Sequence, residues 1–102
     1  MEGTQSMKYK VEFTSGFSKE FKKLDRYTML FIKAWIQNHL EDCENPRQYG
    51  KALKGNKSNS WRYRIGDYRL ICDIQDGNLI ILALSIVHRR EAYDKRSNRL
   101  NN

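Results

Sequence analysis

The chain has 102 residues, with 19 Lys and Arg against 12 Asp and Glu, and a formal net charge of +7. Hydrophobic residues make up 39% and there is one proline, which predicts a single compact domain and argues against wholesale disorder. The charge is uneven: residues 1–46 carry seven basic and seven acidic residues, whereas residues 47–102 carry twelve and five. This asymmetry indicates an anionic partner, most often nucleic acid and sometimes a membrane surface or an acidic protein.

Nothing in the sequence indicates a membrane span or a signal peptide. The longest apolar run, residues 79–87, is about half of the ~20 residues that a spanning helix needs. Residues 1–6 are polar and predict a flexible leader, with Met7 as an alternative natural start. The two cysteines, Cys43 and Cys72, fit reduced thiols better than a disulfide framework, so we expect a cytoplasmic protein.

The first half predicts one strand and two helices. Residues 8–13 alternate between apolar and charged side chains, as a half-buried strand does. Apolar residues then recur at spacings of four and three over residues 17–24, which indicates a short amphipathic helix. A longer stripe predicts a helix from about Arg26 to Asp42, which Pro46 ends.

The second half predicts a basic loop followed by three strands. Residues 46–60 are rich in Gly, Ser, Asn and basic side chains and predict the loop. Strands are expected at residues 61–65, 68–74 and 79–87, and Asp76-Gly77 between the last two is a strong hairpin signal. The fold class is therefore α+β: an N-terminal strand, two helices, then a three-stranded antiparallel meander completing one sheet, with the helices packed on one face.

Alternation along the strands predicts which side chains face the helices. The apolar set that begins with Trp61 and Tyr68 should meet them. Arg62, Arg64 and Arg69 then project from the opposite face, where an open concavity avoids the cost of burying an unpaired charge.

Three segments resemble the RelE/ParE superfamily of bacterial type II toxins. They are Lys-Ala-Leu-Lys-Gly at 51–55, Trp-Arg-Tyr-Arg-Ile-Gly-Asp-Tyr-Arg at 61–69 and His-Arg-Arg-Glu-Ala-Tyr at 88–93. The element order agrees over about residues 7–96, and the chain is more similar to the RelE branch. The resemblance implies a single RelE-like toxin domain over residues 7–96, with a flexible tail at 97–102.

The resemblance also implies an activity and a site. The activity would be that of a ribosome-dependent endoribonuclease, which cleaves mRNA in the ribosomal A site and is neutralised by a cognate antitoxin. Arg69 matches the family's phosphate-binding arginine, Arg90 matches the arginine of a closing Arg-Glu pair, and Tyr93 matches the C-terminal tyrosine. Arg62 and Arg64 match positions that are lysines in the best-known members. An arginine is effectively never deprotonated, so neither can replace a lysine as a base.

Metal-free RNA cleavage uses the ribose 2′-hydroxyl as the nucleophile, and arginines suit stabilisation of the developing phosphorane charge. No metal set or other cofactor is predicted, because His39 and His88 lie far apart and no carboxylates show ligand spacing around them. His88 is either a proton-transfer residue or an ordinary strand-end histidine. The candidate catalytic residues are Arg64, Arg69, His88, Arg90 and Tyr93. The candidate RNA-binding residues are Lys51, Lys54, Arg62, Arg89, Lys95 and Arg96.

Two other functions remain open for the same basic surface. One is a ParE-like inhibitor of DNA gyrase without nuclease activity, and the other is a plain nucleic-acid-binding module. The set formed by Arg69, Arg90 and Tyr93 favours the nuclease, because the gyrase-inhibiting branch generally lacks it.

Overall fold

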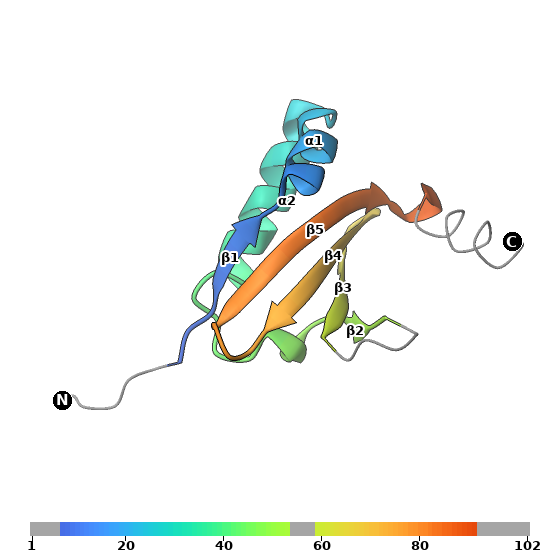
Figure 1. The fold of residues 1–102 in the computed structure, drawn as a ribbon. Helices are drawn as coiled ribbons and strands as arrows, with labels where there is room; N and C mark the ends of the chain where they lie inside the picture. The colour runs from blue at the N-terminus through green and yellow to red at the C-terminus, as the bar shows by residue number, and fades with distance from the viewer. Residues whose placement is uncertain (1–6, 54–58, 92–102) are drawn as a thin grey trace, which may run out of the picture.

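The computed structural model describes residues 7–53 and 59–91, and it has the predicted α+β, RelE-like architecture. Two helices lie along one side of a single sheet (Figure 1). The elements in chain order are β1 (Lys10–Phe13), α1 (Ser15–Lys22), α2 (Arg26–His39), a 3-10 helix η1 (Pro46–Gln48), β2 (Lys51–Ala52), β3 (Ser60–Ile65), β4 (Tyr68–Gln75) and β5 (Ile80–His88).

Both α-helices begin at capping side chains. The Thr14 side chain accepts the backbone N–H of Phe17, and the Asp25 carboxylate accepts that of Thr28. Helix α2 ends at His39, three residues before the predicted Asp42. Asp42 has a φ of 64°, a left-handed conformation that no helix can contain, so the last turn could not extend that far.

The sheet has the strand order β1-β5-β4-β3-β2. Strand β1 pairs parallel with β5, and the other neighbours are antiparallel. Strand β2 comes from the segment predicted as a basic loop, where Lys51 pairs with Arg62 and Ala52 with Trp61. The loop prediction missed it because two residues are too few to show a strand period.

The helices cover one face of the sheet, and the core lies between. Tyr63 and Ile65 from β3, with Leu70 and Cys72 from β4, are fully buried there, as the alternation predicted. The residues between them on each strand therefore belong to the opposite face, which we call the open face.

A bulge in β5 changes which side chains its end presents. Cys72 pairs with Ala83, but the preceding residue, Ile71, pairs with Ser85, so Leu84 is an extra residue in β5. Without it, simple alternation from Ala83 would place His88 on the open face. With it, His88 pairs with Tyr68, which packs against the core, and His88 lies on the helix side.

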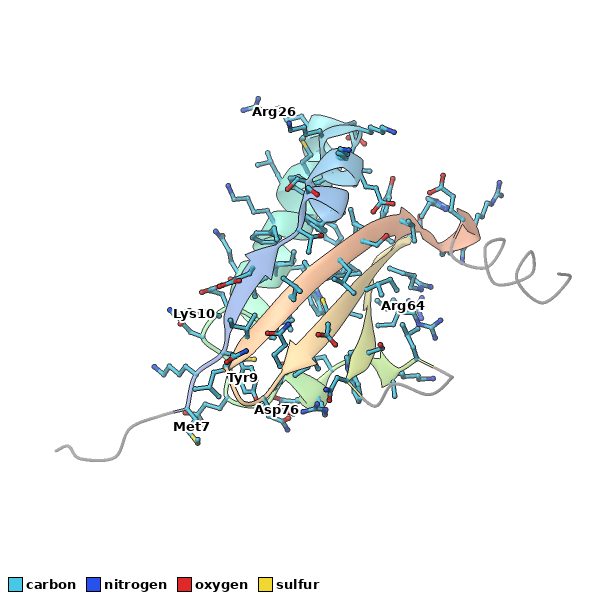
Figure 2. All side chains as sticks on the ribbon, in the orientation of Figure 1. Met7, Tyr9, Lys10, Arg26, Arg64 and Asp76 are labelled. Carbon is cyan, nitrogen blue, oxygen red and sulfur yellow. The ribbon has the colours of Figure 1, made fainter. Side chains whose placement is uncertain are left out.

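Two carboxylates fasten the ends of the sheet to other elements. Asp76, in the β4–β5 turn, accepts the Tyr9 hydroxyl at 2.6 Å and two guanidinium N–H groups of Arg47 at 2.9 and 3.0 Å. Figure 2 shows Tyr9 and Asp76 side by side at this end of the sheet. At the other end, Glu20 of α1 accepts the Ser85 hydroxyl at 2.8 Å and the Ile86 N–H at 2.9 Å, beyond the reach of β1.

No helix within the described ranges is long and apolar enough to cross a membrane.

Candidate phosphate-binding site

The basic residues of β2, β3 and β4 converge on the open face. Arg64 lies directly opposite Arg69 across the β3–β4 pair, and Arg62 lies opposite Lys51 of β2. Like charges directly opposite one another destabilise a sheet, so this arrangement calls for an anion to offset it. We call Lys51, Arg62, Arg64 and Arg69 the arginine face.

Arg69 is the most firmly held of these side chains. Its Nη1 donates to the carbonyl oxygens of Gly66 at 3.1 Å and Tyr68 at 2.9 Å, so the guanidinium folds back over the β3–β4 turn. Partial burial, followed by the charges of Arg64, Arg62 and Arg89, lowers the pKa of Arg69. A partly desolvated arginine among other arginines is the environment that binds a phosphate strongly.

Arg89 adjoins this group from the end of β5. Its backbone N–H donates to the Asp67 carbonyl at 2.7 Å, and its Nε lies 3.9 Å from Asp67 Oδ1. Because Arg89 is bonded to the turn that directly precedes β4, the structure brings it close to Arg69 and so to the arginine face.

His88 and Arg90 do not belong to the arginine face. The His88 ring lies 5.3 Å from that of Tyr68, edge to face, on the helix side of the sheet. Its Nδ1 accepts the Arg90 N–H at 3.2 Å. Arg90 is exposed in the helical turn at residues 89–91, directly after Arg89. The histidine and the arginine face thus project from opposite sides of the sheet, at the same end.

The remaining predicted site residues lie outside the described residues. They are Lys54, Tyr93, Lys95 and Arg96.

A second basic region lies at the corner between α1 and α2. Lys19, Lys22, Lys23 and Arg26 are exposed, and none forms an ion pair within the residues that the structure covers. Counting charges by halves hid this region, because acidic residues balance it in number. Two of those carboxylates are used elsewhere: Glu20 by β5, and Asp25 as the cap of α2. Arg26 and Arg64 lie in separate parts of the molecule (Figure 2).

Residues 7–53 and 59–91 contain no group of three or more His, Cys, Asp or Glu side chains that could hold a metal ion. Burial raises the pKa of the Cys72 thiol well above its usual range, so this cysteine is not a nucleophile.

Sequence reasoning missed the part that Asp67 plays. Three successive carbonyls, those of Gly66, Asp67 and Tyr68, hold Arg69 and Arg89. The signal that would find it is the hairpin register. In the β4–β5 register Tyr68 pairs with His88, which places the turn before Tyr68 next to Arg89. This register can be predicted only when the bulge at Leu84 is known.

A small basic α+β domain with clustered open-face arginines is consistent with a toxin of a type II system, and comparison with known families agrees. The family described as ParE toxin of type II toxin-antitoxin system, parDE, matches residues 11–93. The chain therefore belongs to this family and to the RelE/ParE superfamily of type II toxins.

Several solved structures share the fold. The RelBE2 toxin-antitoxin complex of Mycobacterium tuberculosis matches with a TM-score of 0.72 and 23% identity, covering 84% of this chain and 97% of that one. The isolated RelE toxin of E. coli matches with a TM-score of 0.63 and 21% identity, covering 90% and 98%. The archaeal RelE-RelB complex of Pyrococcus horikoshii matches with a TM-score of 0.62 and 22% identity, covering 80% and 96%. Among curated proteins, none matches the sequence.

Proposed function

We propose that this type II toxin is a ribosome-dependent, metal-independent endoribonuclease that cleaves mRNA in the A site. We also propose that it acts in the cytoplasm and is neutralised by a cognate antitoxin. Three structures of the same fold are complexes of RelE-type toxins with antitoxins, which supports the antitoxin partner.

The observation that carries the nuclease proposal is the pairing of Arg64 with Arg69, beside Arg62 and Arg89. A protein that only needs a positive surface gains nothing by holding a guanidinium against two backbone carbonyls. Fixed donors are what stabilisation of a transition state requires, because they need no reorganisation when charge develops.

The chemistry divides between the RNA and the protein. The ribose 2′-hydroxyl attacks the adjacent phosphorus and the 5′-oxygen leaves. Arg69 and Arg64 bind the non-bridging oxygens and stabilise the extra negative charge of the phosphorane. Tyr93 orients the substrate and Arg90 contacts the phosphate region. Lys51, Lys54, Arg62, Arg89, Lys95 and Arg96 bind the RNA backbone.

The arginines cannot supply a base for proton transfer, because a guanidinium is not deprotonated in proteins. His88 lies on the helix side of the sheet, packed on Tyr68. This position favours an auxiliary contact for His88 over the role of general acid or base. The rate then comes from orientation and charge, with the ribosome helping to position the mRNA.

Expression of the toxin without its antitoxin tests the proposal. Mapping of transcript ends after induction should reveal cuts within translated regions, and purified toxin should cut mRNA on programmed ribosomes while sparing the same mRNA free in solution.

The family match keeps one alternative in view, because the matching family carries the ParE name. A gyrase-directed toxin would leave messages intact and accumulate gyrase–DNA cleavage complexes. That pair of results would replace the nuclease proposal.

A further inference from the structure

The β3–β4 turn carries a carboxylate, Asp67, that acts on both Arg69 and Arg89. Asp67 Oδ1 lies 3.9 Å from Arg89 Nε, as an ion pair rather than a hydrogen bond. The Asp67 charge also raises the pKa of Arg69, against the lowering effect of burial and the neighbouring arginines. An acidic residue in a surface that binds an anion is at first sight unfavourable, because it repels the ligand.

The backbone explains why the carboxylate lies there. Gly66 has a φ of 58°, as a two-residue hairpin turn with glycine first requires. A Cβ at Gly66 would lie 3.2 Å from the Phe31 ring of α2, so the ring packs on the turn and fixes its place. From this fixed turn, the Asp67 carbonyl accepts the Arg89 N–H at 2.7 Å, which sets the Arg89 backbone beside its carboxylate.

We propose that Asp67 is a positioning residue that holds the Arg89 guanidinium beside Arg69, so that both arginines contact the same phosphate of the RNA. This rests on the proposed nuclease function. Without the carboxylate, Arg89 and Arg69 repel one another, and Arg89, which is mostly exposed, has no described side-chain partner to hold it. Its long side chain would then sample many rotamers, and the phosphate would meet one fixed guanidinium rather than two.

A positioning role and a plain turn role predict opposite changes in catalytic efficiency for Asp67→Asn. Asp67→Asn keeps the turn and its carbonyl but removes one negative charge. If Asp67 were only a turn residue, the more positive face would bind RNA more tightly and KM on ribosomes would fall, with kcat unchanged. If Asp67 positions Arg89, kcat falls by about tenfold although the positive charge has increased, because displacement of a contacting group costs rate.

Asp73→Asn is the matched control. Asp73 lies on the same open face, opposite Ser60 of β3, and accepts a hydrogen bond from Gln75 at 3.3 Å. Its loss removes the same charge from the same face without touching Arg89, so kcat should stay unchanged. Asp67→Glu should recover most of the rate, since it restores the carboxylate.

A double variant tests whether Asp67 acts through Arg89. Arg89→Ala should lower kcat, and adding Asp67→Asn to it should lower kcat no further, because the group being positioned is already gone. Additive losses would overturn the proposal, and so would an unchanged or higher kcat for Asp67→Asn in a variant that unfolds at the wild-type temperature.

An NMR measurement separates failure of this proposal from failure of the nuclease assignment. The Arg89 Nε–H resonance of the free toxin should shift in Asp67→Asn and stay in place in Asp73→Asn, whatever the toxin cleaves. An Arg89 resonance unmoved by Asp67→Asn overturns the positioning role. If the resonance shifts but the toxin cuts no mRNA on ribosomes, the nuclease function is overturned. The proposal that Arg69 and Arg89 contact the same RNA phosphate then fails with it, whereas the contact between Asp67 and Arg89 stands.

Discussion

The arginine face and the α1–α2 corner both carry four cations, but they hold them differently. On the arginine face, Arg69 is bound to two carbonyls and is half-buried among like charges. At the corner, three lysines and Arg26 extend into solvent without an ion pair in the described part of the chain. The number of charges is the same, so the difference lies in how precisely each charge is placed. Placed charges suit catalysis, whereas loose ones suit only long-range attraction to a polyanion.

Arg69→Ala is the variant with the largest expected effect. Loss of a donor to a developing oxyanion lowers kcat by about 10²–10³-fold. Because the side chain lies on the open face, truncation leaves no core cavity and the melting temperature should change little. Single-turnover cleavage on programmed ribosomes measures the loss, and growth after induction reports it in cells. A fully active Arg69→Ala toxin would show that the Arg69 guanidinium has no part in the mechanism.

Arg64→Lys sharpens the same comparison. It keeps the charge and restores the residue type found in the best-known relatives, so activity should be retained, within about tenfold of wild type. Cleavage rates for the Lys and Ala variants of Arg64 should therefore differ. Equal losses would show that the planar guanidinium, not the charge alone, is required at this position.

His88→Ala tests whether the helix-side position that the β5 bulge gives His88 keeps this residue out of catalysis. With His88 on the helix side against Tyr68, we expect about a tenfold loss, below the ~10²–10⁴ that a general acid or base contributes. The pH dependence of the single-turnover rate is the companion measurement. A variant as inactive as Arg69→Ala, with a wild-type rate that titrates near the pKa of imidazole, would make His88 the catalyst.

The corner cations should contribute less, and only to binding. Replacing Lys19, Lys22 and Lys23 with Gln should raise KM on ribosomes by a few fold at low salt and leave kcat unchanged, because solvent-exposed charges act mainly through screened attraction. Lys33→Gln is a single-site control on the exposed face of α2. A fall in kcat would mean that the corner positions the substrate, and the contrast between the two regions would fail.

Asp76→Asn should have the smallest effect on activity and act on stability instead. Hydrogen bonds from Arg47, then Tyr9, lower the pKa of Asp76 in the folded protein. A lowered pKa stabilises the fold above the unfolded pKa, near 4, and this contribution is lost as the pH falls through the folded value. Thermal unfolding should therefore show a lower melting temperature for Asp76→Asn at pH 7, with the two proteins converging as the pH falls through the lowered pKa of Asp76 in the folded protein. A difference in melting temperature that does not shrink at any acidic pH would contradict the ionic origin.

The fold was predictable because its signals are local. The period of β1, the apolar stripes of the helices and the turn at Asp76 each specify one element, and the strand alternation placed Arg62, Arg64 and Arg69 on the open face. Strand β2 was not predictable, since its two residues pair only through the register of β3.

The candidate site was predicted in part. Its strand arginines follow from alternation, whereas His88 and Arg89 depend on the one-residue insertion at Leu84, which no turn signal or glycine marks. The contact of Asp67 with Arg89 follows from that same shift. A side chain's face is therefore predictable only up to the first bulge along its strand.

The parallel pairing of β1 with β5 has a consequence for synthesis. The first strand of the chain completes the sheet only by pairing with the last one, from Lys10 beside Ile80 to Phe13 beside Ala83. Residues so distant in sequence meet late, and Arg89 reaches its turn only after all of β5 has left the ribosome. The nascent chain is thus without its assembled site until β5 is complete, because the arginines of β3 and β4 are made before the strand that brings Arg89 to them.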